Sequence, residues 1–338
     1  MHKKIEELEK QAAIYEQALE ALKKMQKFKE LLFKLLSIFI HLPASEIDKE
    51  IEKGLTQIGK FWNFDRITLA QFSDEIKEIN ITHTYVAKGI QDLTINSIDS
   101  IVPWLMEKLT FGDVVCLNHL PDDLPIDATV DREHFFRHGV KSVCALPFKV
   151  EGSVRGGLFF ASINNKHAWT YELVQELKYF AEIISNALEH KKVTLQINEQ
   201  IQFEHLLSEI SATYINIPVK NIDSNIRTHL GRLGRFLKAD RCVLYLASEN
   251  KNVFEFSPLL SWWHEEDTEF YSEVVKWAMD TKTLEDNVYK DFQYSFDKWS
   301  KGEHLQVTSL DDLPKEAEKQ KTIYQKFGIK SFISIPMT

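Results

Sequence analysis

The feature of this sequence that most constrains its fold is an internal repeat. Residues 30–66 align without a gap with residues 205–241, an offset of 175. Residues 136–147 align with residues 325–336 in the same way, at an offset of 189. Shared spacing in two separate stretches indicates a duplication. A chain of 338 residues is also long enough for two domains, so we expect two copies of one domain.

The two copies differ in length and completeness. The change of offset, 189 minus 175, gives the second copy a net insertion of 14 residues, which we expect between Trp263 and Trp299. The residues after Pro147 have no counterpart in the second copy, because the sequence ends at Thr338. We therefore expect the second domain to be truncated, and a downstream output module to lie outside this sequence.

Apolar residues near the N-terminus follow a heptad pattern that is typical of a coiled coil. We assign residues 1–27 to an N-terminal coiled-coil helix, with a single helix packed on its own domain as the alternative. The stripe is formed by Ile5, Leu8, Ala12, Tyr15, Leu19 and Leu22.

After Leu22 the apolar stripe steps by three residues. Such a step predicts a local slip that overwinds the supercoil before the first domain begins. The stripe then continues at Met25, Phe28, Leu32, Leu35 and Phe39.

A second long helix is predicted in the middle of the chain. Thr170 suits a helix N-cap, and no Pro or Gly follows until Pro218. We predict a connecting helix over residues 172–213 that overlaps both domains. Together with the N-terminal helix it is expected to form the interface of a homodimer. Its apolar positions begin with Leu173, Leu177, Phe180, Ile184 and Leu188.

Between these helices the apolar pattern changes to period two, which indicates strands. Turns are expected at Ser73–Glu75 and Glu151–Gly152. The sequence thus predicts an α+β fold, an antiparallel sheet flanked by helices, over residues 28–190 and again over residues 203–338. The segments expected as strands in the first copy are 67–71, 79–83, 114–117, 142–150 and 154–162.

Charge and cysteine content exclude several classes of protein. Fifty acidic against 41 basic residues give a net charge of −9, which repels phosphate backbones, so we expect no direct nucleic-acid binding. No apolar run is long enough to span a membrane, and no secretory signal is visible. Cys116, Cys144 and Cys242 form no CxxC pair, which fits a reducing compartment. We therefore expect a cytoplasmic protein.

Three stretches of this sequence resemble a bacterial GAF domain. Residues 35–72 resemble its first half, and residues 135–162 followed by residues 168–191 resemble its second half. The resemblance implies two PAS-like GAF domains in tandem, each with a ligand pocket between the sheet and the overlying helices. Such domains commonly precede a histidine kinase, a sigma-54 activator or a diguanylate cyclase. No motif of those output domains occurs in these residues, so no catalytic residue is assigned and enzymatic activity is left to the parent protein.

The motifs that would name a ligand are absent or altered. Residues 165–169 resemble the Asn-Lys-x-x-Phe motif of cyclic-nucleotide-binding GAF domains, but Trp169 replaces Phe and the following spacing is shorter. Residues 131–136 hold no cysteine for a covalent bilin. His134 and His138 lack a third partner for a metal or haem. Cyclic nucleotide and haem are disfavoured, as is the clustered-cysteine chemistry of GAF-fold methionine sulfoxide reductases.

Aromatic residues in the segments expected to cover the sheet suggest an apolar pocket oriented by a few polar groups, although each can equally be core. The sequence thus favours a sensory region that binds an unidentified small molecule and controls a histidine kinase. A scaffold without a ligand, or the regulatory region of a sigma-54 activator, is the alternative. The candidate ligand-binding residues are His83, Trp104, Arg132, Phe135, Cys144, Asn164, Trp262 and Trp263.

Overall fold

A computed structural model describes residues 2–72, 79–90, 102–150, 152–164, 166–250, 253–264 and 291–337. The chain divides into two compact units, Met1–Glu199 and Gln200–Thr338. The turn predicted at Ser73–Glu75 lies outside the described residues, as do Glu151 and Asn165.

A five-stranded antiparallel sheet forms the centre of the first unit. Its strand order is β2-β1-β5-β4-β3, so the last strand along the chain lies in the middle and pairs with both β1 and β4. The predicted α+β architecture with an antiparallel sheet is confirmed. The strands are β1 (Arg66–Phe72), β2 (Ile79–Val86), β3 (Val115–Leu117), β4 (Ser142–Val150) and β5 (Ser153–Ser162).

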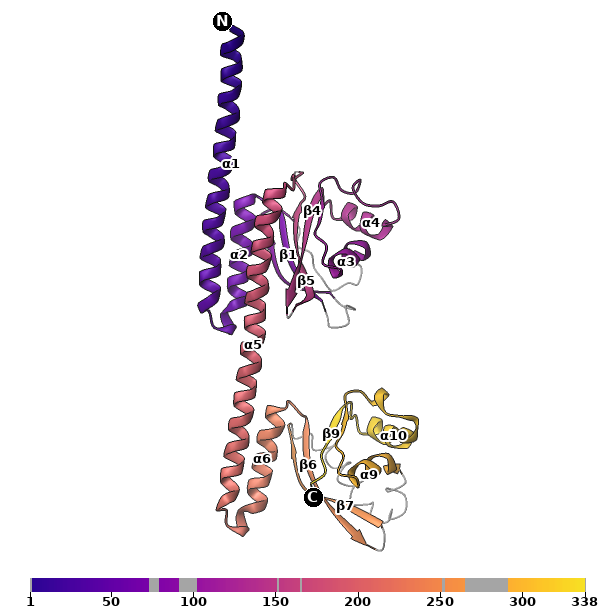
Figure 1. The fold of residues 1–338 in the computed structure, drawn as a ribbon. Helices are drawn as coiled ribbons and strands as arrows, with labels where there is room; N and C mark the ends of the chain where they lie inside the picture. Colours follow the sequence, from indigo (N-terminus) through magenta and orange to yellow (C-terminus); the bar gives the residue numbers. More distant parts are fainter. Residues whose placement is uncertain are drawn as a thin grey trace. The chain divides into compact units, whose positions relative to one another are not determined.

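Three helices cover one face of this sheet (Figure 1). They are α1 (His2–His41), α2 (Ile47–Trp62), which follows the short 3-10 turn η1 (Ala44–Glu46), and the first part of α5 (Tyr171–Ile215). Apolar side chains from the helices and the strands form one continuous core between them. Its fully buried members include Phe28, Leu35, Leu55, Phe160, Leu177 and Phe180.

Two short helices, α3 (Pro103–Thr110) and α4 (Thr129–Arg137), cover the opposite face (Figure 1). Because side chains alternate along a strand, β3, β4 and β5 send neighbouring residues into different cores. The second core includes Leu105, Leu109, Leu117, Phe135 and Val143. Both faces of the sheet are therefore buried.

Helix α1 carries two apolar faces. Phe28, Leu32, Leu35 and Phe39 lie in the core, at most 6% exposed, whereas Phe33 and Ile40, about 100° further round the helix, are 70% and 62% exposed. The heptad positions between Leu22 and Phe33 are the polar residues Gln26 and Lys29, so the outer apolar face is interrupted there. The stripe that the sequence analysis continued from Phe28 to Phe39 lies in the domain core.

The second unit repeats the order of elements. The last part of α5 is followed by η3 (Val219–Asn221), α6 (Ile222–Phe236), β6 (Arg241–Asn250) and β7 (Val253–Trp263). In the described residues, β6 pairs with β7 and β8 pairs with β9, in two separate sheets. The segment between β7 and α9, residues 264–292, is longer than the matching segment between β2 and α3, residues 87–102. The insertion was expected in this part of the second copy. The remaining elements are α9 (Gln293–Trp299), β8 (Leu305–Val307), η5 (Leu310–Asp312), η6 (Lys315–Ala317), α10 (Glu318–Lys326) and β9 (Phe332–Ser334).

A glycine and an aromatic ring make the same contact in both units. Gly59 of α2 lies against the ring of Tyr85, and Gly234 of α6 lies against the ring of Trp262. Tyr85 pairs with Ile67, and Trp262 pairs with Cys242, which follows Arg241 and matches Ile67 in the repeat. The two rings therefore occupy matching positions. A Cβ on either glycine would overlap the ring. The repeated glycine thus allows close approach of helix and strand.

Replacing this glycine should destabilise the first unit. In Gly59→Ala the new methyl group must displace Tyr85, and overpacking of this kind costs about 1–3 kcal/mol, more than the gain of about 1 kcal/mol from the better helix former. Gly54→Ala is the matched control on the same helix, because its methyl group would lie 3.5 Å from Leu35 Cδ2, an ordinary contact. Thermal unfolding should show a lower Tm for Gly59→Ala and an equal or higher Tm for Gly54→Ala. Equal effects of the two substitutions would contradict the packing argument.

Candidate functional site

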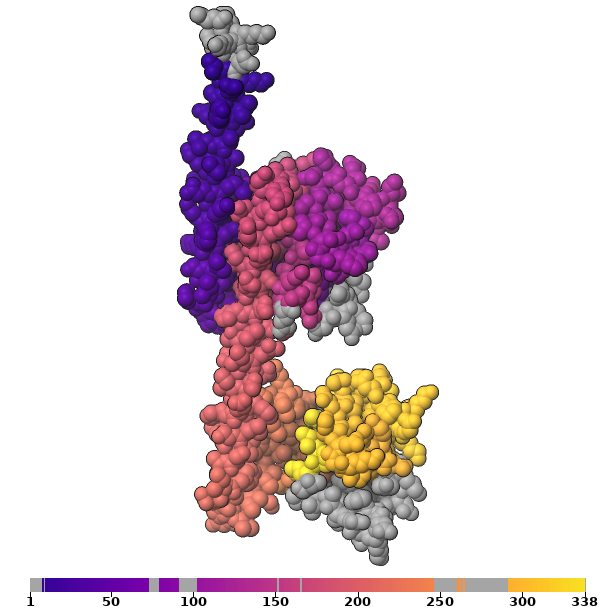
Figure 2. Space-filling view, in the orientation of Figure 1, coloured from indigo at the N-terminus to yellow at the C-terminus, as the bar shows by residue number. Residues whose placement is uncertain are grey.

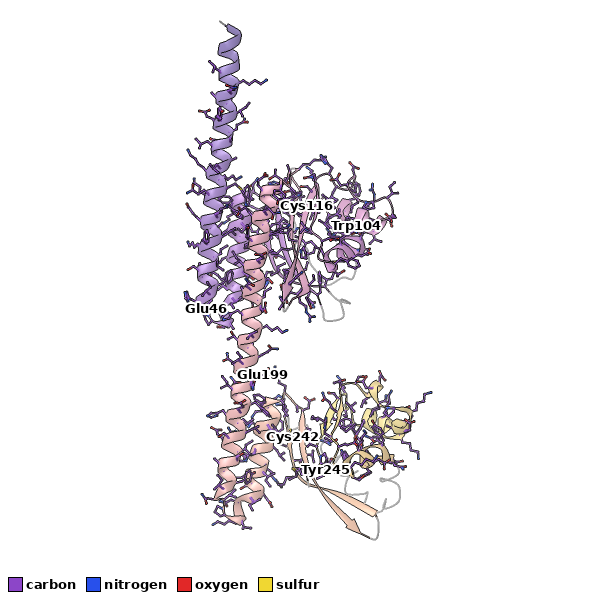
Figure 3. The ribbon with its side chains drawn as sticks, viewed as in Figure 1. Glu46, Trp104, Cys116, Glu199, Cys242 and Tyr245 are labelled. Atoms are coloured by element: carbon purple, nitrogen blue, oxygen red, sulfur yellow. The ribbon has the colours of Figure 1, made fainter. Side chains whose placement is uncertain are left out.

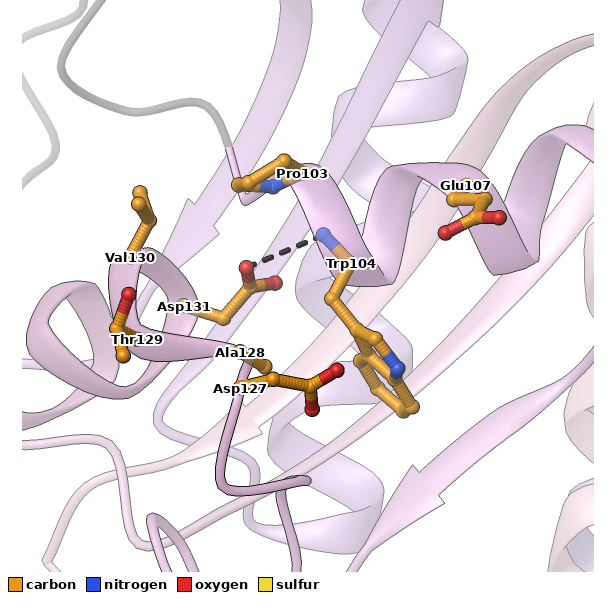
Figure 4. A pocket seen from close by; sticks show the side chains of 8 residues that line it. All are labelled: Pro103, Trp104, Glu107, Asp127, Ala128, Thr129, Val130 and Asp131. Atoms are coloured by element: carbon orange, nitrogen blue, oxygen red, sulfur yellow. Dashed lines mark hydrogen bonds between the residues drawn. The ribbon is translucent and has the colours of Figure 1, made fainter.

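The candidate site lies where α3 and α4 meet on the cover of the sheet. Pro103 occupies the first turn of α3, and Val102 at its N-cap has no side-chain hydrogen-bond acceptor. The missing cap comes from α4: the carboxylate of Asp131 accepts a hydrogen bond from the backbone N–H of Trp104 at 3.1 Å (Figure 4). It accepts a second one from the backbone N–H of Leu105 at 3.0 Å. Asp131 therefore ties the two cover helices together.

Asp131 is fully buried, and its electrostatics follow from that position. Burial raises the pKa of the Asp131 carboxyl, and the N–H groups of Leu105 and Trp104 oppose this shift. The start of a helix carries partial positive charge, which favours a carboxylate there. The start of α3 thus stabilises the Asp131 carboxylate, and Asp131 has a structural role in this site.

A pocket with a volume of about 230 Å³ opens beside this contact. Ligand sites commonly measure about 300–1,000 Å³, so this pocket is small. Its lining holds three carboxylates and no basic residue, which suits a neutral or positively charged group better than a phosphate. Figure 4 shows the indole of Trp104 beside Asp127 at its rim. The lining residues are Pro103, Trp104, Glu107, Asp127, Ala128, Thr129, Val130 and Asp131.

Four of the predicted residues lie on or near this cover. Trp104 lines the pocket, and Phe135 is buried in the apolar core next to it. Arg132 donates a hydrogen bond to the carbonyl of Leu124 at 2.9 Å. The side-chain amide of Asn164 donates to Asp65 at 2.7 Å, which fixes the end of β5.

The other predicted residues are not brought to this pocket. His83 and Cys144 point to the opposite face of the sheet, towards the three helices. Trp262 packs against α6 in the second unit. The side chain of Trp263 lies outside the described residues.

Sequence reasoning missed the carboxylates of this site. Asp131 and Leu105 are 26 residues apart, and no local pattern links them. The sequence signal for this contact was Pro103 at a helix start that has no polar N-cap residue. The first free N–H groups of such a helix take an acceptor from outside it. Asp127 and Glu107 show no pattern that distinguishes them from other surface acids.

Histidines on α4 and at its end do not form a metal centre by themselves. The rings of His134 and His138 lie 4.6 Å apart between centroids. In the part of the chain that the structure describes, no three His, Cys, Asp or Glu side chains converge as metal ligands.

At the start of α5, the backbone N–H of Leu173 donates to Thr170 Oγ1 at 3.3 Å, so the predicted N-cap is confirmed.

No protein-family model matches the sequence, and no curated protein matches it. Solved structures do. The bacteriophytochrome RpBphP3 of R. palustris matches 92% of this chain over 60% of its own, with a TM-score of 0.55 at 10% identity. The phytochrome photosensory core module of Stigmatella aurantiaca matches 91% over 61%, with a TM-score of 0.52 at 13% identity.

Single GAF domains also match. The phycocyanobilin-bound GAF domain of a cyanobacterial phytochrome covers 49% of this chain and 96% of its own, with a TM-score of 0.42 at 15% identity. The fold is similar to that of the two phytochromes. At these identities the similarity concerns the fold alone. In the described part of the chain, no helix is long and apolar enough to cross a membrane.

Removing the buried carboxylate should loosen the cover of the sheet. Asp131→Ala leaves the N–H groups of Trp104 and Leu105 without an acceptor, and losing a helix cap costs about 0.5–2 kcal/mol. Asp127→Ala is the matched control, because it removes an exposed carboxylate from the same pocket. Denaturant titrations should show a lower free energy of unfolding for Asp131→Ala and little change for Asp127→Ala. A cost as large for Asp127→Ala would contradict the capping role.

On the other face of the sheet, His83 should make stability depend on pH. Its side chain is buried on β2, and His83 Nε2 lies 3.4 Å from Asp48 Oδ1 of α2. Burial lowers the pKa of His83, and the nearby carboxylates of Asp48 and Glu52 oppose this. The unfolded chain therefore binds the His83 proton more tightly than the folded chain.

The contribution of His83 is accordingly full above its ordinary pKa of about 6.5 and is lost as pH falls below it. The free energy of unfolding of the wild type should decrease from pH 7.5 to pH 5.5 by more than that of His83→Gln. His119→Gln, an exposed histidine, should follow the wild type. Parallel pH profiles for the wild type and His83→Gln would contradict this assignment.

Proposed function

We propose that this chain is the sensory and regulatory region of a signalling protein, with two GAF domains over residues 28–190 and 203–338. A change in the first domain is transmitted through the connecting helix, residues 172–213, to an output domain outside this sequence. A histidine kinase is the preferred output, and a sigma-54 activator is the alternative. The similarity in fold to phytochromes, one of them described as a photosensory core, supports a sensory role.

The observation that carries this proposal is the dual membership of α5. Its residues Leu177, Phe180 and Ile184 are fully buried in the first unit, directly behind the sheet. The same helix continues without a break to Ile215, beyond Glu199, where the first unit ends. A packing change in the first unit would therefore act on a helix that continues beyond it.

The partner we propose for the helices is a second copy of the chain. The outer stripe of α1 includes Tyr15 and Leu22, which are 74% and 66% exposed, and Figure 2 shows this part of α1 extending beyond the rest of the first unit. A second exposed stripe follows on α5 at Val193, Ile197 and Ile201. The heptad spacing on α1 is a pattern by which identical helices pair, so a homodimer would bury that stripe. The exposed apolar residues on α5 are spaced by four and would extend the same interface.

A ligand-free scaffold is the second candidate, and one observation favours it. Leu105, Leu109, Phe135 and their neighbours fill the space between the sheet and the cover helices with packed apolar side chains. The pocket beside them holds only about 230 Å³. In that case the domains dimerise and dock partners without a small molecule.

The bilins named for the matching GAF domains are not proposed as ligands of this chain. Helix α4 holds no cysteine, and the nearest ones, Cys116 and Cys144, face the helices on the far side of the sheet from the pocket. The acidic lining of the pocket likewise argues against a cyclic nucleotide. A small neutral or cationic metabolite fits the described residues better.

Native mass spectrometry of the purified chain tests oligomeric state and retained ligand together. We expect a dimer for the wild type and for Gln17→Glu, whose residue lies opposite the stripe. Leu19→Glu should give a monomer, because a buried charge at a heptad core position is costly. A monomeric wild type at micromolar concentration would contradict the dimeric mechanism.

The same spectra separate the two candidate functions. A dimer with additional mass that disappears on denaturation supports the sensory function, and the mass identifies the class of ligand. A dimer that carries no additional mass, and whose Tm is not raised by cell metabolite extracts, supports the scaffold.

A further inference from the structure

The structure brings two cysteines together on neighbouring strands. Cys116 of β3 lies directly opposite Cys144 of β4 in the antiparallel register. Directly opposed residues project to the same face, with their Cα atoms about 4.5–5.5 Å apart. A disulfide needs a Cα separation of about 4.4–6.8 Å. Both are free thiols, and they can be joined without moving the strands.

The two thiols differ in accessibility. Cys144 is completely buried in the core beneath the helices, whereas Cys116 is half-buried on β3, the edge strand of the sheet. Figure 3 marks the position of Cys116, and Trp104 of the pocket lies on the cover helix α3. A reagent in solution therefore reaches Cys116 first.

The surroundings also give the two thiols different roles. The hydrogen bond from the Cys144 thiol lowers the pKa of Cys116, and the ammonium group of Lys178 on α5 lowers it further. The neighbouring Cys116 and burial both raise the pKa of Cys144. Because the thiolate is the nucleophile, the greater exposure of Cys116 and the direction of its pKa shift favour Cys116 as the attacking thiol.

The fold itself does not require cysteines at these positions. In the second unit, β8 and β9 take the places of β3 and β4, and Gln306 lies opposite Ile333 at the matching pair. An amide and an aliphatic side chain thus stand where the first unit has two thiols, although these two residues are exposed and the thiols are not.

We propose that Cys116 and Cys144 form a redox site that hydroperoxides oxidise to a reversible disulfide. The Cys116 thiolate attacks the O–O bond, becomes a sulfenic acid and releases an alkoxide, or hydroxide from hydrogen peroxide, which takes up a proton. The Cys144 sulfur then attacks the sulfenic sulfur, and its proton leaves with the hydroxyl group as water. Two electrons pass from the thiols to the peroxide, and a small thiol reductant reverses the reaction.

Oxidation removes the titratable Cys116 thiol, whose charge interacts with Lys178 on α5. It would thereby change the electrostatics of the helix that the proposed function uses for transmission. This consequence rests on the proposed function, whereas disulfide formation does not. Disulfide chemistry and dimerisation are measured separately, so failure of one leaves the other standing.

The test treats the folded chain with one equivalent of hydrogen peroxide, alkylates the remaining thiols and digests the product with trypsin. Arg132, Arg137 and Lys141 separate the two cysteines, so a disulfide appears as two linked peptides. We expect linkage of Cys116 to Cys144 and full alkylation of Cys242, the internal control. In Cys144→Ser, a cyclic 1,3-dione should trap the sulfenic acid at Cys116, and Lys178→Met should slow linkage several-fold.

Three results would overturn the proposal. Full alkylation of both cysteines in the peroxide-treated wild type would show that no disulfide forms. Oxidation of Cys242 at an equal rate would show unselective chemistry. Dione labelling of Cys144 in Cys116→Ser as fast as that of Cys116 in Cys144→Ser would show that Cys116 is not the nucleophile. Circular dichroism checks that each variant is folded, and the alanine variant at the same position replaces any serine variant that is not.

Discussion

The apolar layer between the sheet and helices α1, α2 and α5 is the interaction on which the rest of the first unit depends. Phe28, Leu55 and Phe180 come from three helices far apart in the sequence and are fully buried against the same strands. Each buried side chain of this size contributes about 1.5–3 kcal/mol. This layer holds α1 and α5 against the sheet, while apolar side chains on their outer faces remain exposed.

The two faces of the sheet consequently have different roles in the proposal. The cover face is made of short helices and loops, and a single buried carboxylate, Asp131, joins α3 to α4. The helix face carries His83, Cys116 and Cys144. Burial lowers the pKa of His83, and the two thiols shift each other's pKa, with smaller effects from Asp48 on α2 and Lys178 on α5.

Several elements were predictable because their signals are local. The helix predicted over 172–213 runs from Tyr171 to Ile215, and the strand predicted over 142–150 has those bounds in the structure. Residue periodicity reports burial on one side of one element, and that is enough to place it. The burial of Phe28 to Phe39 in the domain core could not be read from the sequence, because periodicity does not say which neighbour covers an apolar face. His83 and Trp262 were expected in ligand pockets, but they contact α2 and α6 instead. Their sequence positions did not reveal these neighbours.

The amino-acid sequence by itself determined the duplication, the α+β class and the positions of the long helices, because spacing and turn residues act over a few neighbours. Only the tertiary structure decided which cysteines face each other, which carboxylate caps α3 and which apolar face of α1 remains exposed. These depend on strand order and on the placement of β5 between β1 and β4. Such contacts join residues tens of positions apart, and their energy exists only once the sheet has formed.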